Sequence, residues 1–339
     1  MRLTAAIPRG GFGFHRRGLM LTRRATVERG LSAGFASALP VRVRADDSAG
    51  APGADRPNLR FGIVADVQYA DKPPSGRRDY RGSLAKAARC VEAWNGADLA
   101  FAIELGDLTD DRARDGTRED LARICDVFTS LRPPLRHVVG NHGPPTAGRQ
   151  AYLEALGLER PWYDFGVPGW RFVVLDATGL SLKAWPAGSP RRAQSEAFSQ
   201  AHRGCGTPEP VDHNGGIDPE QMAWLRGVLA KAVAARERVA VFCHTPVLAE
   251  ASRRSHLLWN HGEVLAVLEA CPAVAVYFAG HDHRGGCAFR NGIHHVTLEG
   301  MVESPPGGNA FGIVAVCPDR LVLLGVGTVT SRTMALRAG

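Results

Sequence analysis

Leu59 to Asp71 reads LRFGIVADVQYAD, an apolar run that stops at Val64 and is followed by the polar residues Asp66 and Gln68. The run from Leu59 to Val64 predicts a buried strand. In an open α/β sheet, ligands bind in the crevice outside the carboxyl ends of the strands. The stretch therefore predicts an α/β fold whose first strand brings a carboxylate and an amide to a binding crevice.

The same arrangement recurs four more times along the chain. Apolar runs that predict buried strands span residues 99–105, 135–139, 239–242 and 274–279. The polar clusters that follow them are Gly106-Asp107, Gly140-Asn141-His142, Cys243-His244 and Gly280-His281-Asp282-His283. Five strand ends that carry oxygen and imidazole groups are expected to meet at one crevice, and together they predict a metal site with two ions.

The residue types suit divalent metal ions, which prefer carboxylate, amide and imidazole ligands at hydrolytic sites. Two ions about 3.5–4 Å apart need a bridging carboxylate, and Asp107 is the natural bridge because it stands alone on its turn. Each cluster by itself is more often a turn or a hydrogen-bonded histidine, but all five in this order favour the metal site. The predicted metal ligands are Asp66, Gln68, Asp107, Asn141, His244, His281 and His283.

The rest of the chain alternates helix and strand and then becomes rich in strands. Helices are predicted over about residues 81–94 and 118–131, a hairpin over 165–177, and an inserted loop over the active face at 178–216. Tight turns at 291–292 and 318–319 separate the later strands. This order predicts two sheets packed face to face with helices outside, in one domain over residues 59–335.

Two helix starts carry capping signals. Asp218 is the expected N-cap of a long helix, with Pro219 at its first position and Gln221 at its third. Asn260 and Glu263 predict the same capping arrangement for the following helix, which is expected to end near residue 270.

The first 45 residues differ from the rest of the chain in charge. They hold nine of the 41 Lys and Arg residues and one of the 34 acidic residues, so the net charge of +7 arises in this segment and the remainder is nearly neutral. Because no excess of basic residues is left in the remainder, no nucleic-acid partner is expected.

Residues 1–45 also predict export. Arg23-Arg24 precedes a mildly apolar stretch that ends at Val41, which resembles a twin-arginine signal cleaved after Ala45, and Met20 is an alternative start. The stretch is shorter than the ~20 residues of a membrane span, and residues 46–58 predict a linker. The protein is therefore expected in the periplasm or outside the cell. The alternatives are a disordered basic extension or a misassigned start on a cytoplasmic protein.

In the order of its five clusters, the sequence resembles the calcineurin-like metallophosphoesterases. Four stretches look like one subfamily, the manganese-dependent ADP-ribose/CDP-alcohol diphosphatases: FGIVADVQYAD (61–71), HNGG (213–216), LWN (258–260) and HHVTLEGMVESPP (294–306). The resemblance covers about residues 59–335. It implies the four-layer α/β/β/α sandwich of the superfamily and two divalent ions, with manganese expected first and iron, zinc or magnesium as alternatives.

The resemblance also implies a role for each ligand. One ion would be held by Asp66, Gln68, Asp107 and His283, and the other by Asp107, Asn141, His244 and His281. His142 would be the catalytic residue that stabilises or protonates the leaving oxygen. The implied reaction is in-line attack of a metal-bound hydroxide on the pyrophosphate of a nucleoside diphosphate-linked small molecule.

Five further residues are predicted to contact substrate. Asn214, Asn260 and His295 lie in the stretches that carry the resemblance, and Arg77 and Arg78 would hold the second phosphate unless they are solvated surface arginines. The sequence departs from the subfamily at two places. Gly143 stands where an acidic residue is expected after the Asn-His pair, and residues 72–75 offer no aromatic ring to stack on a base.

Two other functions remain open at this point. One is a phosphodiesterase or phosphomonoesterase of the same superfamily, which the same metal ligands would serve. The other is a non-catalytic metal-binding scaffold, which is disfavoured because the chain keeps every predicted ligand and His142.

Overall fold

The computed structural model describes residues 57–204 and 211–337, and its strands form two mixed sheets of six strands. The first sheet has the order β12-β11-β10-β1-β2-β3 and the second β4-β5-β6-β7-β9-β8. The strands are β1 (Leu59–Val64), β2 (Phe101–Glu104), β3 (Leu135–His137), β4 (Tyr163–Val167), β5 (Trp170–Leu175), β6 (Arg238–Cys243), β7 (Val274–Ala279), β8 (Arg284–Arg290), β9 (Ile293–Glu299), β10 (Ala310–Val316), β11 (Arg320–Gly327) and β12 (Arg332–Ala335).

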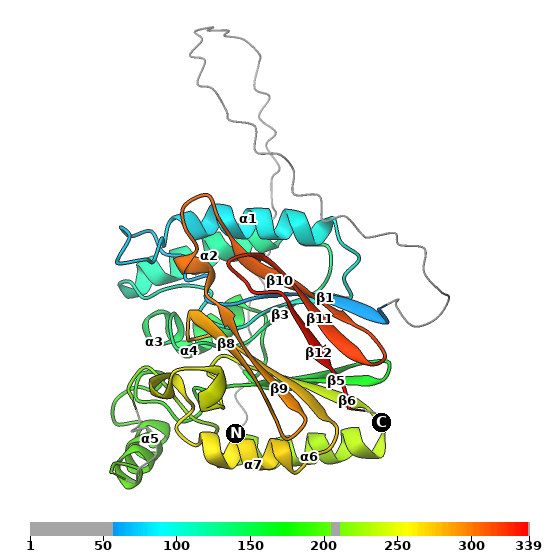
Figure 1. The fold of residues 1–339 in the computed structure, drawn as a ribbon. Helices are drawn as coiled ribbons and strands as arrows, with labels where there is room; N and C mark the ends of the chain where they lie inside the picture. The colour runs from blue at the N-terminus through cyan, green and yellow to red at the C-terminus, as the bar shows by residue number, and fades with distance from the viewer. Residues whose placement is uncertain (1–56, 205–210, 338–339) are drawn as a thin grey trace, which may run out of the picture. The chain divides into compact units, whose positions relative to one another are not determined.

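Helices cover the outer face of each sheet (Figure 1), with α1 and α2 over the first sheet and α6 and α7 over the second. The α-helices are α1 (Gly82–Asn95), α2 (Arg114–Phe128), α3 (Pro144–Ala147), α4 (Arg149–Ala155), α5 (Pro190–Ala201), α6 (Pro219–Ala234) and α7 (His261–Glu269). Short 3₁₀ turns are η1 (Ala249–Ala251), η2 (Arg254–His256) and η3 (Met301–Glu303). The layers confirm the predicted α/β/β/α sandwich.

Parallel pairing sets the direction of the strands that precede the polar clusters. β1 pairs parallel with β2, which pairs parallel with β3. In the second sheet, β5, β6, β7 and β9 run parallel to one another, and the edge strands β4 and β8 pair antiparallel with β5 and β9. The carboxyl ends of β1, β2 and β3 therefore share one edge of the first sheet, and those of β6 and β7 share one edge of the second.

An aromatic cluster fills the space between the two sheets. Phe61 of β1 stacks on Phe101 at 4.9 Å between ring centroids, and it meets Phe172, Phe242 and Phe278 of the second sheet edge-on at 5.8–6.2 Å. These rings are buried. Since neighbouring residues of a strand face opposite sides, the residues that alternate with them, such as Val241, pack under the helices in a second core.

Most predicted elements agree with the structure to within a few residues, and β1 and β7 agree at both ends. Asp218 caps α6 as predicted, because its side chain accepts the backbone N–H of Gln221. Asn260 is the N-cap residue of α7 as predicted, but the expected capping bond is absent: its amide bonds both backbone groups of Ile217, at 3.0 and 2.8 Å, and makes no cap hydrogen bond to α7.

The predicted inserted loop is corrected by α5, a twelve-residue helix within it. Ser189 caps this helix by accepting the backbone N–H of Arg192, and Pro190 occupies its first position. This is a standard start signal. The helix lacks a clear apolar stripe, and only Ser195 and Ser199 are fully buried in it, so the periodicity on which the sequence analysis relied was absent.

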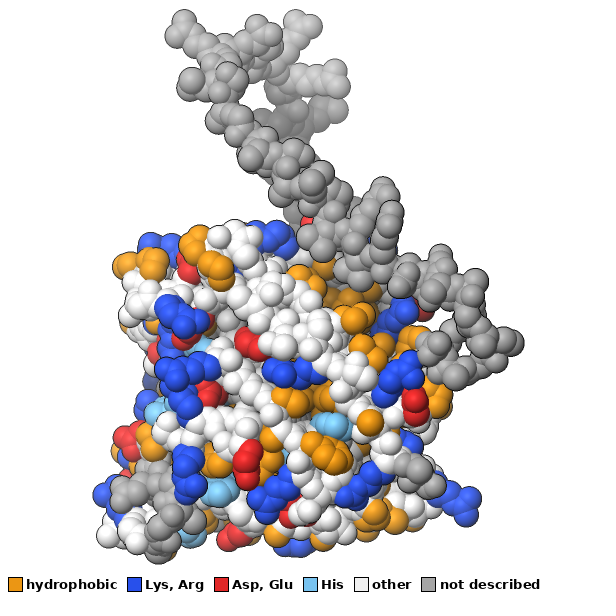
Figure 2. Space-filling model, viewed as in Figure 1, with side chains coloured by type: hydrophobic (Ala, Val, Ile, Leu, Met, Phe, Trp, Pro, Cys, Tyr) orange, Lys and Arg blue, Asp and Glu red, His pale blue; other side chains and the backbone are white. Residues whose placement is uncertain are grey.

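The predicted export signal lies outside the described residues, as does the predicted linker up to residue 56, and both stay predictions. Within the described residues, none of the helices is long and apolar enough to cross a membrane. Lys and Arg side chains are interspersed with Asp and Glu over the face drawn in Figure 2, in line with the near-neutral charge of this part of the chain.

Replacing Phe61 by Ala tests the aromatic cluster as the main contact between the sheets. The substitution leaves a cavity between the sheets and should lower the free energy of unfolding by about 3–5 kcal/mol. Phe289→Ala is the control, because Phe289 is 60% exposed and its loss should change stability by less than about 0.5 kcal/mol. Urea unfolding of metal-stripped protein measures both, and equal effects would contradict this account of the core.

Candidate active site

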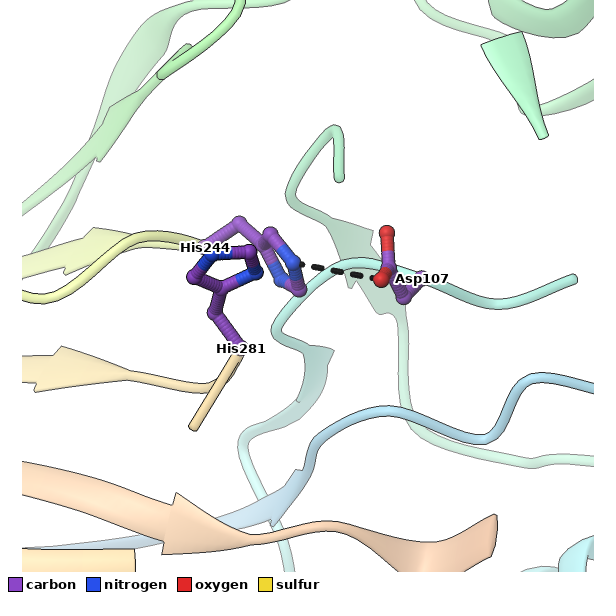
Figure 3. A group of neighbouring side chains, drawn as sticks. All are labelled: Asp107, His244 and His281. Atoms are coloured by element: carbon purple, nitrogen blue, oxygen red, sulfur yellow. Dashed lines mark ion pairs between the residues drawn. The ribbon is translucent and has the colours of Figure 1, made fainter. Parts of the chain in front are cut away.

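The polar residues that end the strands converge, and four of them have unusual backbone conformations. Asp66, Gln68, Asp107 and His281 all have positive φ, between 43° and 67°. Residues other than glycine rarely adopt this left-handed region, and when they do they often lie at functional sites. Two of these residues, Asp107 and His281, face each other and His244 from the ends of strands in the two sheets (Figure 3).

Asp107 lies at the centre of the group. Its Oδ2 accepts a hydrogen bond from Gln68 Nε2 at 3.1 Å and lies 3.3 Å from His244 Nε2. Its Oδ1 accepts the backbone N–H of His142 at 2.8 Å. Gly140 makes this approach feasible, because a Cβ there would lie 2.1 Å from Asp107 Oδ1. One carboxylate therefore touches residues that follow β1, β3 and β6.

Asp66 organises the other side of the cluster. Its Oδ2 accepts the backbone N–H of His281 at 2.9 Å, and its Oδ1 lies 3.2 Å from His283 Nε2. Asn141 Oδ1 similarly lies 3.0 Å from His244 Nε2. All seven predicted ligands are thus brought together in a buried group.

Two oxygens of this group have no hydrogen-bond partner among the described residues. They are Gln68 Oε1 and Asp66 Oδ1, both fully buried, and Asp66 Oδ1 has only the ion-pair contact with His283 Nε2 at 3.2 Å. A buried carboxylate or amide oxygen without a partner is costly unless it binds a cation. Ligand atoms on one six-coordinate ion with bonds of about 2.1 Å stand about 3 Å apart, which is close to the spacings around Asp66, Asn141 and His244. The residues present therefore fit divalent ions.

Each of the three histidines has its other ring nitrogen against an oxygen outside the group. His244 Nδ1 lies 2.9 Å from the backbone oxygen of Leu105, and His283 Nδ1 lies 3.0 Å from Glu303 Oε1. His281 Nε2 lies 2.7 Å from Asn214 Oδ1. Such outer contacts fix the ring orientation and the tautomer of metal-binding histidines.

Charges in the group explain how its pKa values shift. Burial opposes charge on His244 and His283, but Asp107 and Asp66 outweigh burial and raise the pKa of each ring to about 9. Burial also opposes ionisation of Asp107, yet His244 and His142 hold the pKa of that carboxyl below its usual range. Burial, with His244 alongside, lowers the pKa of His281 well below its usual range. The carboxylates thus attract positive charge into a buried site.

His142 lies beside this group and is held by two carboxylates. Its Nδ1 lies 2.8 Å from Asp111 Oδ2 and 3.3 Å from Asp110 Oδ1. Burial favours the neutral ring, but Asp107, Asp110 and Asp111 raise the pKa of His142 well above its usual value. Asp111 also accepts the backbone N–H of Gly143 at 3.0 Å. A carboxylate from the segment after β2 thus stands beside the position where the subfamily pattern expects an acidic residue.

A cavity of about 270 Å³ opens onto the ligand group. Its lining residues are Gln68, Arg78, Asp107, Asn141, His142, Lys183, His213, His256, His281 and His283. A second, mostly apolar cavity of about 320 Å³ lies between α5 and α6 and includes none of these residues. The polar cavity is the one that can hold a substrate against the ligand group.

Of the five predicted substrate contacts, only Arg78 lines the polar cavity. Arg77 is 75% exposed and pairs with Glu303. Asn214 turns inward to His281, and Asn260 holds Ile217. His295 shares the helix-covered face of β9 with Ile293, and its ring lies 6.0 Å from that of Tyr277. These positions follow from strand parity and hydrogen bonding, and neither is visible in a motif.

The sequence analysis missed several residues of the site. Asp110 and Asp111 hold His142, and Glu303 holds His283. Asp110 and Asp111 directly follow the Asp107 turn, and Glu303 lies within residues 294–306, so their place in those stretches was an available signal. His213 begins the HNGG stretch, which was an available signal, whereas Lys183 and His256 come from segments without periodicity, where the sequence offers little to single them out.

Comparisons with known proteins agree with this geometry. The model of the calcineurin-like phosphoesterase family matches residues 59–285. A protein of Oryza sativa subsp. japonica named manganese-dependent ADP-ribose/CDP-alcohol diphosphatase is 35% identical over 79% of this chain and 91% of its own length. A Homo sapiens protein of the same name is 32% identical over 81% of this chain and 92% of its own length.

A solved structure agrees as well. The crystal structure of a dimetal phosphatase from Danio rerio superposes with a TM-score of 0.76 at 32% identity, covering 83% of this chain and all of that one. The family match extends over about two thirds of the sequence and includes all five strand-end clusters. The chain therefore belongs to the calcineurin-like phosphoesterase family.

Proposed function

We propose that the protein is a two-metal hydrolase that cleaves the pyrophosphate of nucleoside diphosphate-linked compounds such as ADP-ribose or CDP-alcohols. The observation that carries the proposal is the buried group around Asp107, with the unpartnered oxygens of Asp66 and Gln68 beside a polar cavity. The names of the relatives support the substrate class and the choice of manganese.

In this proposal Asp107 is shared by two ions. Asp66, Gln68 and His283 complete one site, and Asn141, His244 and His281 complete the other. Bound divalent ions supply Lewis-acid stabilisation of charge on the phosphate and make a water molecule a better nucleophile. The carboxylates Asp66 and Asp107 offset the charge of the ions inside a buried site.

His142 is placed to serve the leaving group. Because Asp111 holds its Nδ1, Nε2 is the nitrogen left to meet a substrate in the cavity that His142 lines. A ring held in this way by a carboxylate keeps one orientation, and it can donate a proton to the departing oxygen. Asn141, its neighbour in sequence, contacts His244 instead, so the two adjacent side chains divide metal binding from proton transfer.

The cavity carries two cations for a second phosphate, and they differ in their partners. Arg78 is already close to Asp110 and Glu303, at 3.7 and 4.0 Å. Lys183 has no carboxylate partner among the described residues. The turn before it is fixed, because Ser181 Oγ accepts the backbone N–H groups of Lys183 and Ala184. We therefore assign the second phosphate chiefly to Lys183.

A substrate panel tests the reaction. Metal-stripped protein reloaded separately with Mn, Mg, Fe or Zn should cleave ADP-ribose and CDP-choline with higher kcat/KM than cyclic nucleotides, bis(p-nitrophenyl) phosphate or the monoester p-nitrophenyl phosphate, and Mn should be the best metal. Lys183→Met should raise KM for the diphosphates about tenfold, since it removes a charged hydrogen-bond donor.

Lys231→Met is the control for the panel, because Lys231 is exposed on α6 and does not line the polar cavity. It should leave every KM unchanged. A preference for cyclic nucleotides or monoesters over both diphosphates would instead favour a phosphodiesterase or a phosphomonoesterase. Absence of hydrolysis of every compound with each metal would favour a scaffold.

Metal counting tests the shared carboxylate. Asp107→Asn should lose both ions, or most of the affinity for both, because it removes the negative charge from the group at the centre. Gln68→Ala should weaken only one site, since Gln68 would hold only the ion that Asp66 and His283 also hold. Equilibrium dialysis with elemental analysis gives the stoichiometry. Two full equivalents of metal in Asp107→Asn would contradict the assignment.

The leaving group tests His142. Positioned acid–base groups contribute typically about 10²–10⁴-fold, so His142→Ala should lower kcat for ADP-ribose by that factor while both ions stay bound. The loss should be small for bis(p-nitrophenyl) phosphate, because p-nitrophenolate leaves without a proton. Asp111→Asn should show the same pattern in weaker form. An equal loss on both substrates would argue against an acid role for His142.

A further inference from the structure

We propose that Asn214 is a positioning residue for the metal centre, whose side-chain oxygen accepts the Nε2–H of His281 and leaves Nδ1 as the nitrogen that binds an ion. The inference deepens the proposed function, because it rests on His281 being a ligand of one of the two ions. Asn214 was expected to contact substrate, but it is absent from the lining of the polar cavity and is only 3% exposed.

The orientation of the Asn214 amide follows from its partners. Its Nδ2 lies 2.9 Å from the backbone oxygens of both Ser255 and Leu257. Backbone oxygens only accept hydrogen bonds, so the group that faces them is the NH₂ and the group that faces His281 is the oxygen. That oxygen lies 2.7 Å from His281 Nε2. An amide oxygen also only accepts, so Nε2 carries the hydrogen.

The backbone around Asn214 is also held. The N–H of Asn214 bonds the oxygen of Val211, and the N–H of Trp259 bonds the oxygen of Gly215, both within 2.9 Å. Asn260 bonds both backbone groups of Ile217. The segment 211–217 is thus fixed on both sides of Asn214, and its amide is held in place when it meets His281.

Asn214 differs in kind from the outer partners of the other two histidines. The partner of His244 is the backbone oxygen of Leu105, and no substitution removes a backbone oxygen. The partner of His283 is the carboxylate of Glu303. Asn214 offers a neutral side-chain oxygen, and two of its three hydrogen bonds serve only to aim that oxygen. Its acceptor role and its donor role can therefore be separated by mutation.

Three variants of the full chain separate these roles. Asn214→Leu removes all three side-chain hydrogen bonds and replaces the amide with an apolar side chain of similar size. Asn214→Asp keeps an acceptor for His281 and loses the donors to Ser255 and Leu257. Asn260→Leu is the matched control, since Asn260 anchors the same segment and makes no hydrogen bond to His281. Outer partners of metal-binding histidines typically contribute about 10–100-fold in metal affinity.

Manganese titration of metal-stripped protein provides the first readout. Asn214→Leu should weaken one of the two Mn equivalents by about 10–100-fold and leave the other unchanged. Asn214→Asp should recover most of that loss, and Asn260→Leu, which loosens the segment but keeps the partner of His281, should weaken binding much less than Asn214→Leu. If Asn214 served only to hold the carbonyls of Ser255 and Leu257, Asn214→Asp would bind no better than Asn214→Leu, and this result would overturn the inference.

The tautomer of His281 provides a second readout that needs neither metal nor activity. Ring ¹⁵N shifts of metal-free protein with labelled histidine, with the His281 signals assigned by their loss in His281→Gln, should show the Nε2–H form alone in the natural chain and a mixture in Asn214→Leu. An Nδ1–H form in the natural chain, or an unchanged tautomer in Asn214→Leu, would overturn the inference. A natural chain that binds fewer than two Mn ions would instead refute the proposed function.

Discussion

The left-handed backbone at the residues that end the strands is the constraint on which the site depends. A strand that continued in its own direction past β1 or β2 would carry its side chains alternately to the two faces of the sheet. Positive φ at Asp66, Gln68 and Asp107 turns them instead toward the second sheet, and the same conformation at His281 brings that residue to meet them. Such conformations each cost of order 1–3 kcal/mol, so the packed sheets on either side must hold them in place. Phe61 belongs to β1 and packs against the aromatic rings of the second sheet. This cluster is one of the contacts that hold the sheets together and so offset the cost of the strained residues.

The three histidines are alike in sequence but not in surroundings. The ring nitrogen of His283 that points away from the ligand group meets the carboxylate of Glu303. The corresponding nitrogens of His244 and His281 meet neutral oxygens. A carboxylate partner makes the ring a more basic ligand, and a neutral partner orients the ring with less effect on its basicity. We infer that the two ion sites differ in affinity, and that the site containing His283 and Asp66 has the stronger imidazole ligand.

The sequence was sufficient for the strands and for the group of seven ligands, because both depend on short local patterns. A buried strand shows itself by its apolar run, and a ligand shows itself by following that run, as Asp107 and His244 do. The direction in which isolated polar side chains point could not be predicted from the sequence. His295 faces the helices because of its parity with Ile293 in β9, and Asn260 bonds Ile217 across 43 residues of chain. For the carboxylate beside His142, the sequence shows that Asp111 lies near the Asp107 turn, but the contact of Asp111 with Gly143 forms only when the chain folds.

The segment between α5 and α6 contains a pair of adjacent residues that face different partners. His213 lines the cavity, while Asn214 holds His281. A molecule bound against His213 and an ion bound by His281 would therefore both act on the same short stretch of backbone. Affinities for the two are then thermodynamically linked, and linkage is reciprocal: whatever factor the metal contributes to substrate binding, substrate contributes to metal binding. With favourable coupling, an enzyme that is short of metal would bind more of its ions when substrate is present.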